Sequence, residues 1–140
     1  MEYHKDPHRV YSLIYHLIFV VKYRQPVFLE DIGIIEAVKT KITELSMNFE
    51  VKVLEIECGS DHIHLLISAK PTLDIPKYIN TIKGHSSRFL RKHYKDFLQN
   101  KLWGAHFWSS SYFIASTGNV SIDVLKRYVE NQQRRVALEH

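Results

Sequence analysis

The sequence predicts an α+β fold built on an antiparallel sheet, and three observations support it. Apolar and polar residues alternate over 10–23, as in a half-buried strand. Apolar residues recur every three or four positions over 31–48, as in an amphipathic helix. Two apolar runs flank a tight turn at 59–61, as in a β-hairpin. A chain of 140 residues is long enough to enclose one hydrophobic core.

The first half of the chain supplies the first strand, a helix and a hairpin. The strand at 10–23 is rich in aromatic and β-branched residues and ends before Pro26. The helix at 31–48 needs a sheet to cover its apolar side. Beyond it, strands are predicted at 51–58 and 62–69, on either side of the turn.

The second half completes the order βαββαβ. A helix is predicted from 73 to about 97, an aromatic-rich strand at 105–116, and a last helix over about 121–135. This order resembles the ferredoxin-like, RRM-like arrangement, with helices on one face of an antiparallel sheet. No repeat or linker divides the chain, so we expect one domain over 1–137, and 138–140 to be the remnant of an expression tag.

Composition narrows the functional classes. A net charge of +4 is only mildly basic, and the longest apolar run, at 17–21, is too short for a membrane span. The start of the chain lacks the apolar core of a signal peptide. The single cysteine, Cys58, cannot pair within the chain and is typical of a small buried hydrophobe in a reducing compartment. We therefore expect a cytoplasmic protein.

Basic residues are concentrated in the helix predicted after residue 73. Ser87, Arg88 and Arg91 share a stripe with Gly84, where a phosphate backbone could approach closely, and Lys83 belongs to the same basic segment. We expect these four polar residues to contact DNA, although a solvated helix face has the same composition.

Two pairs of residues suggest chemistry. His62 and His64 are two apart in a predicted strand, so both imidazoles share one face and could hold a divalent metal. Tyr128 and Gln132 are four apart in a predicted helix and are therefore neighbours. A metal and an attacking phenol could break and rejoin a nucleic-acid strand without ATP. The alternatives are two solvated histidines, a tyrosine packed on the sheet, and a surface glutamine.

Five blocks in the same order resemble the single-tyrosine HUH transposases of insertion sequences, which include the TnpA-like and REP-associated enzymes. The blocks are 15–24, 61–67, 83–88, 108–113 and 127–132. The resemblance spans about 11–134, and Ser110 departs from it where relatives often have proline. It implies that His62 and His64 bind Mg²⁺ or Mn²⁺, that Gln132 completes the metal site, and that Tyr128 forms a 5′-phosphotyrosine intermediate.

The resemblance also implies the partners. Such enzymes act on single-stranded DNA, recognise hairpins at the ends of the mobile element, and work as homodimers. The tyrosine helix then serves its own subunit or reaches across to the partner, and Gly118 lies where such a helix would pivot. The hairpin sequence, the preferred metal and the proton acceptor for Tyr128 stay open.

Two other functions are compatible with the same elements. A ferredoxin-like sheet with aromatics and a basic helix is also an RNA-binding layout, although the usual glycine- and aromatic-rich strand signature is missing. A transcriptional regulator derived from a transposase would retain DNA binding, and the sequence does not separate it from an active enzyme.

Overall fold

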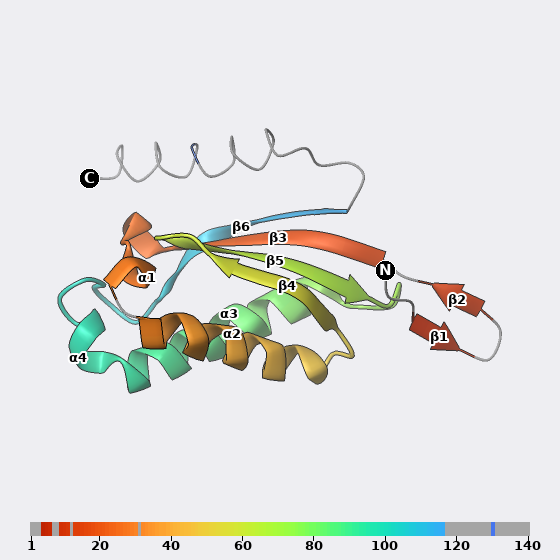
Figure 1. The fold of residues 1–140 in the computed structure, drawn as a ribbon, viewed down its shortest axis with the longest axis horizontal. Coiled ribbons are helices and arrows are strands. Elements are labelled where there is room, and N and C mark those ends of the chain that lie inside the picture. The colour runs from red at the N-terminus through yellow and green to blue at the C-terminus, as the bar shows by residue number, and fades with distance from the viewer. Residues whose placement is uncertain (1–3, 7–8, 12, 31, 117–129, 131–140) are drawn as a thin grey trace.

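The centre of the fold is a four-stranded antiparallel sheet. The computed structural model describes residues 4–6, 9–11, 13–30, 32–116 and 130. The sheet has the order β4-β5-β3-β6 (Figure 1). Its strands, in chain order, are β3 (Leu13–Val21), β4 (Lys52–Cys58), β5 (His62–Ala69) and β6 (Trp108–Ser116). In chain order the arrangement is second, third, first, fourth, so the ferredoxin-like prediction is confirmed.

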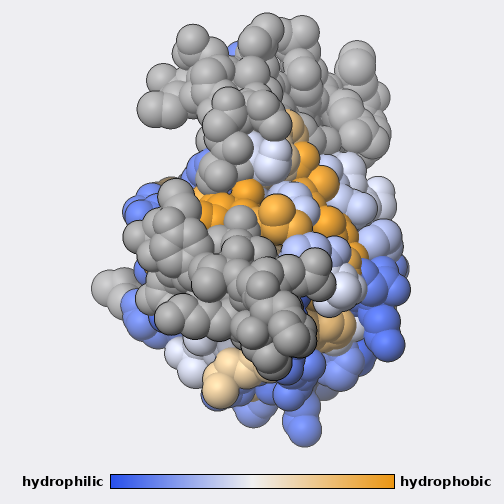
Figure 2. All heavy atoms as spheres, turned by 90° about the vertical axis from the view of Figure 1, so that its right-hand side faces the viewer, coloured by the Kyte–Doolittle hydropathy of each residue, from blue (hydrophilic) through white to orange (hydrophobic). Residues whose placement is uncertain are grey.

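Two long helices cover one face of this sheet. α2 (Ile32–Met47) and α3 (Ile75–His93) lie side by side beneath it (Figure 1). The strands turn alternate side chains toward them, which places Leu17, Phe19 and Ile63 in the core with no exposed surface. Figure 2 shows hydrophobic residues gathered at the level of the sheet, with mostly hydrophilic residues over the helix side.

α3 ends earlier than the sequence predicts. It begins at an N-cap, where Asp74 accepts a hydrogen bond from the backbone N–H of Lys77 at 3.2 Å. Tyr94 then leaves the helical conformation, with φ −120° and ψ 34°, and α4 (Lys95–Leu98) follows as a separate turn. The prediction of one helix to about 97 is therefore wrong. The break turns Leu98 into the core, where it is buried.

The N-terminal region also differs from the prediction. β1 (His4–Asp6) and β2 (Arg9–Tyr11) form a separate two-stranded sheet, so the long first strand begins only at Leu13. A short 3₁₀ turn, η1 (Lys22–Arg24), and a short helix, α1 (Val27–Glu30), follow β3. Neither was predicted, because such short elements lack a readable period.

The end of the chain is described only in part. The last strand begins at Trp108, three residues later than predicted. The helix predicted over 121–135 lies outside the described residues, apart from Glu130. Among the described segments, no helix is both long and apolar enough to cross a membrane.

Candidate metal centre and basic pocket

β5 separates core side chains from candidate ligands by simple alternation. Ile63, Leu65 and Ile67 point into the core and are buried, whereas His62 and His64 are half-buried on the opposite face. The two histidines therefore share the face that α2 and α3 leave open, as the sequence predicts. A divalent ion approaching this face would meet both imidazoles.

The turn before β5 is fixed by three backbone hydrogen bonds. The N–H of Gly59 donates to the carbonyl of His62 at 2.8 Å, and Val21 donates to the carbonyl of Asp61 at 2.8 Å. From α1, Phe28 donates to the carbonyl of Ser60 at 3.1 Å. The start of β5 is thus held from three directions, which limits how far His62 can move.

Asp61 orients the ring of His62. Its Oδ1 lies 3.0 Å from Nδ1 of His62, and its Oδ2 lies 2.5 Å from Nε of Arg24. Burial alone would raise the pKa of Asp61, but the hydrogen bond with His62 and the charge of Arg24 outweigh it and lower that pKa. An ionised carboxylate at Nδ1 leaves Nε2 of His62 for a ligand, as outer-shell carboxylates do in metal sites.

Gly59 makes room for this ring. A Cβ at position 59 would lie 2.3 Å from Cε1 of His62 and 2.8 Å from its Nδ1. Any other residue here would force the imidazole or the turn to move. The glycine is required by close approach of a side chain, which its position in a tight turn did not indicate.

His64 has a different partner, which the sequence analysis missed. Its Nε2 lies 2.9 Å from Nδ1 of His16, and the two rings stack with centroids 5.2 Å apart. Burial, and then the charge of His16, lower the pKa of His64 against the opposing effect of Glu57. His64 is therefore neutral at pH 7, the form that binds metals. The signal for His16 was its even position in β3, on the same face as Ile18, which pairs with His64.

The donor set fits part of a divalent site. The two imidazoles share a face, and one of them is oriented by a carboxylate. No group of three or more candidate ligands among His, Cys, Asp and Glu comes together within the described residues. Ligation of a metal through Nε2 of His64 also requires its hydrogen bond with His16 to open. Tyr128 and Gln132 lie outside the described residues.

A basic pocket of about 540 Å³ lies between α3 and the start of β6. Lys22, Lys83 and Arg88 line it together with the hydroxyl-bearing Ser87 and Ser109, and its lining contains no carboxylate. Cations and hydroxyls without competing acids suit a phosphate group. Three of the four residues expected to contact DNA belong to this lining, and Arg91 does not.

Most of the residues expected to contact DNA also make hydrogen bonds within the chain. Lys83 Nζ donates to the carbonyls of Ser109 at 2.6 Å and Ser111 at 3.3 Å, and burial lowers its pKa to about 8. Ser87 Oγ accepts from the N–H of Phe107 at 3.0 Å.

Arg91 also makes hydrogen bonds within the chain, whereas Arg88 is exposed. Arg91 donates to the carbonyls of Leu102 and His106, at 3.1 and 3.4 Å. Arg88 is exposed at the pocket. Of the four residues, Arg88 is thus the one whose cation has the freest access to a ligand.

Cys58, the single cysteine, is a free thiol that packs against the core. The thiol is half-buried against the core, and burial raises its pKa to about 11. It stays protonated at neutral pH and is a poor nucleophile and a poor metal ligand.

The chain combines a ferredoxin-like sheet, a histidine pair on the open face of β5 and a basic pocket between α3 and β6. Residues 9–132 match the model of the family described as "Transposase IS200 like". The chain belongs to this family and is a DNA-cleaving and DNA-joining enzyme of the transposase class. The resemblance inferred from the five sequence blocks is confirmed.

Individual relatives agree with the family. The chain is 33% identical over 132 residues to the ISDra2 transposase TnpA of Deinococcus radiodurans, covering 94% of this chain and 92% of the relative. It is 29% identical over 125 residues to the transposase for insertion sequence element IS200 of Salmonella typhimurium, covering 89% and 80%.

Solved structures support the same fold. A structure described as a transposase from Deinococcus radiodurans superposes with a TM-score of 0.80 at 28% identity, covering 92% of this chain and 97% of that one. A REP-associated tyrosine transposase bound to a REP hairpin superposes with a TM-score of 0.53 at 11% identity, covering 91% and 68%. The second likeness concerns the fold alone.

Proposed function

We propose that this transposase cuts and rejoins single-stranded DNA through a covalent intermediate on Tyr128. The observation that carries the proposal is the open face of β5, where His62 and His64 lie together and Asp61 orients one of them. Together with family membership, this arrangement favours phosphoryl transfer over binding alone. We take residues 1–137 as the unit that performs it.

The side chains around the turn have distinct roles in the proposal. His62 and His64 hold a divalent ion, Asp61 and Arg24 fix the ring of His62, and Gly59 leaves the space that this ring needs. Gln132 completes the set as an oxygen ligand. Mg²⁺ or Mn²⁺ bound there supplies positive charge to the scissile phosphate and to the departing oxygen.

The proposed reaction is a transesterification that conserves bond energy. The phenolic oxygen of Tyr128 attacks the scissile phosphorus, and the bond from phosphorus to the 3′ oxygen breaks. Tyr128 keeps the 5′ phosphate of one fragment as an ester, while the other fragment of the same strand leaves with a 3′ hydroxyl. The proton lost by the phenol balances the proton gained by the 3′ oxygen. Attack by another 3′ hydroxyl reverses the step, so no ATP is needed.

DNA contacts come from the basic pocket. Arg88 presents its charge there, and Lys22 and Lys83 add to the positive potential that attracts a phosphate backbone. The REP-associated tyrosine transposase of similar fold is bound to a REP hairpin, and we propose that this chain likewise recognises a hairpin near each end of its element.

A covalent-adduct assay tests the function. Labelled single-stranded DNA from the element end is incubated with the protein and Mn²⁺, and we expect a labelled adduct that survives denaturation. Tyr128→Phe should abolish this adduct, whereas Tyr94→Phe, a half-buried tyrosine at the end of α3, should retain it. An undiminished adduct with Tyr128→Phe would refute the role of this residue, and DNA binding without any adduct would favour a non-catalytic module.

We also propose a homodimer, and a mixing experiment decides how its active sites are built. His62→Ala and Tyr128→Phe chains are co-expressed so that mixed dimers form. If the tyrosine serves the partner's histidines, mixed dimers regain one complete site and form the adduct. If it serves its own subunit, each site lacks one group and no adduct appears. Sedimentation of the wild-type protein as a monomer would contradict the dimer.

A further inference from the structure

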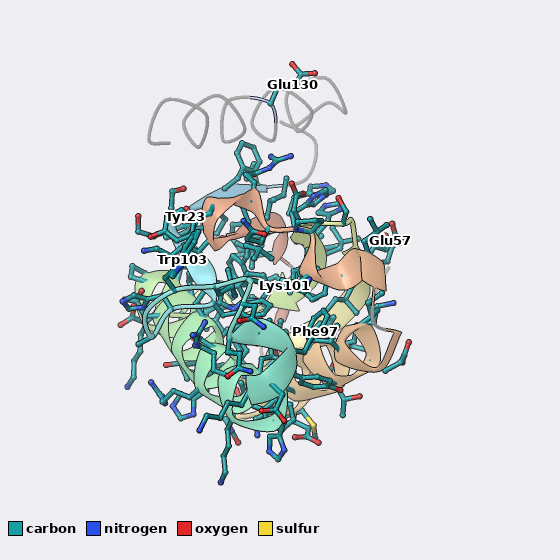
Figure 3. The ribbon with its side chains drawn as sticks, turned by 90° about the vertical axis from the view of Figure 1, so that its left-hand side faces the viewer. Tyr23, Glu57, Phe97, Lys101, Trp103 and Glu130 are labelled. Carbon is teal, nitrogen blue, oxygen red and sulfur yellow. The ribbon has the colours of Figure 1, made fainter. Side chains whose placement is uncertain are left out.

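An exposed aromatic pair lies beside the basic pocket and has no role in the reaction proposed above. Trp103 is 64% exposed, an unusual position for the largest side chain. Its ring system packs edge-to-face with Tyr23, with centroids 5.4 Å apart and planes at 75°. Figure 3 shows the two residues side by side at the end of the molecule where η1 lies. We call Trp103 and Tyr23 the aromatic platform.

The platform is held in place by its backbone. Tyr23 and Arg24 both have positive φ, 59° and 54°, a conformation that non-glycine residues rarely adopt and that costs free energy. The ion pair of Arg24 with Asp61 holds this turn against the start of β5. The N–H of Lys22 donates to the carbonyl of Phe107 at 2.9 Å, which ties the turn to the segment that carries Trp103. The indole is thus presented to solvent on a fixed support.

The chain segments that carry the platform hold only positive charges, and Asp61, which pairs with Arg24 beside Tyr23, is an acidic neighbour from another element. Segments 22–29 and 97–116, which carry the two rings and their flanks, contain lysine, arginine and histidine but no acidic residue. Lys22 Nζ lies 5.5 Å from the centroid of the Tyr23 ring, and Lys22 also lines the basic pocket. Lys22 therefore lies next to both the aromatic platform and the basic pocket.

We propose that the aromatic platform stacks an unpaired base of a DNA strand whose phosphates run along the basic pocket. Exposed aromatics beside a cationic groove are the usual means of binding single strands, because every base has a face to stack and only an unpaired base offers it. This inference rests on the proposed function for its ligand class. Arg24, next to Tyr23, also pairs with Asp61, next to His62, so a single turn connects the platform to the open face of β5.

The experiment compares DNA affinities of the full chain by fluorescence anisotropy. Labelled single-stranded oligonucleotide is titrated with wild type, Trp103→Ala, Trp103→Phe and Met47→Ala. We expect Trp103→Ala to weaken binding about 5- to 150-fold, the range for losing one stacked base. Trp103→Phe should retain most of the affinity. Met47, 71% exposed at the end of α2, is the matched control and should bind as wild type.

Intrinsic fluorescence gives a second readout. The chain has two tryptophans, and Trp108 is buried with its Nε1 donating to Ser86 Oγ at 2.9 Å. Oligonucleotide should quench the exposed Trp103, and the quenching should be much weaker in Trp103→Phe, which keeps only Trp108, a buried residue of the pocket lining. Quenching as strong in Trp103→Phe as in wild type would overturn the proposal.

The failure of this inference is separable from failure of the function. If Trp103→Ala binds single strands as tightly as wild type while wild type forms the Tyr128 adduct, the platform proposal is overturned and the enzyme assignment stands. If Trp103→Ala changes the sedimentation coefficient but not DNA affinity, the platform is a contact between copies of the chain, and base stacking is refuted. If Trp103→Ala binds single strands more weakly than wild type but wild type forms no adduct, the platform is supported and the proposed reaction is refuted.

Discussion

The open face of β5 and the basic pocket beside α3 use polar side chains in opposite ways. At the open face, the polar groups bind one another, as Arg24 binds Asp61 and Asp61 binds His62, and the last member of the series faces outward. At the pocket, Lys83 and Arg91 donate to backbone carbonyls. The first cluster leaves one imidazole edge facing outward, whereas much of the second holds the segment before β6 onto α3.

The difference shows why a count of cations is a weak predictor of binding. Lys83 and Arg91 were expected at a DNA surface because of their charge, yet each also donates hydrogen bonds to backbone carbonyls of the segment before β6 or of β6 itself. Arg88, from the same stripe, remains exposed at the pocket. The five predictions below separate functional from structural roles in the two regions.

The largest effect is expected at His62. His62→Ala removes one of the two imidazoles from the open face of β5. We expect adduct formation to fall roughly 1,000-fold, since metal stabilisation of the transition state amounts to several kcal/mol. Thermal stability should change little, because the ring is on the open face. A single-turnover assay with Mn²⁺ measures the rate. A rate of adduct formation within threefold of the wild-type rate would show that His62 is not part of the active site.

Asp61→Asn tests whether the carboxylate positions His62. The amide cannot balance the charge of Arg24 and is a weaker acceptor for Nδ1, so Mn²⁺ affinity should fall about 10- to 100-fold. Binding is measured directly by electron paramagnetic resonance of free Mn²⁺. Glu57→Gln is the matched control, a carboxylate of the same face that pairs with His64 in the sheet. An equal loss in both variants would indicate a general charge effect.

Replacing glycine with alanine should weaken Mn²⁺ binding at position 59 and should stabilise the fold at position 84. Gly59→Ala places a Cβ against the His62 ring, so we expect Mn²⁺ affinity to drop about tenfold. Gly84→Ala meets Arg88 only at 3.5 Å, an ordinary contact, and should stabilise α3 by about 0.5–1 kcal/mol through helix propensity. Chemical denaturation and the Mn²⁺ titration measure both quantities. Unchanged Mn²⁺ affinity in Gly59→Ala would show that the ring has room to shift.

Ser87 and Arg88 are neighbours in sequence with different expected roles. Ser87→Ala leaves the buried N–H of Phe107 without its acceptor, so the free energy of unfolding should fall by about 1–3 kcal/mol. Arg88→Ala should leave stability unchanged and reduce the slope of log affinity against log salt by about one. Urea unfolding and DNA titrations over a salt series distinguish them. A salt slope that does not change in Arg88→Ala would place the phosphates elsewhere.

The last prediction is a pH dependence of stability that arises from Lys83. Burial lowers its pKa from 10.5 to about 8, so between these values the unfolded chain binds a proton that the folded chain lacks. Raising the pH through this window therefore favours the folded state. The stability of wild type relative to Lys83→Met should increase from pH 8 to pH 10.5, measured by urea unfolding. A difference that stays constant with pH would show that Lys83 keeps its charge in the fold.

Period-two and helical patterns predicted much of the fold. The alternation in β5 correctly placed His62 and His64 on one face, and the βαββαβ order correctly predicted the sheet. Boundaries were less accurate, as at Tyr94, because a single residue ended α3 where the apolar period continued. The assignments of Tyr128 and Gln132 stay predictions, since both lie outside the described residues.

The sequence by itself determined which side chains share a face, because alternation in a strand is a local property of the backbone. Only the tertiary structure decided which groups touch across the fold. His16 reaches His64 across 48 positions, Arg24 reaches Asp61 from a left-handed turn, and Lys83 reaches Ser109 from another element. Such contacts depend on strand register and helix docking, which long-range packing sets. A charge in the sequence therefore does not reveal whether it will meet a ligand or a carbonyl of its own chain.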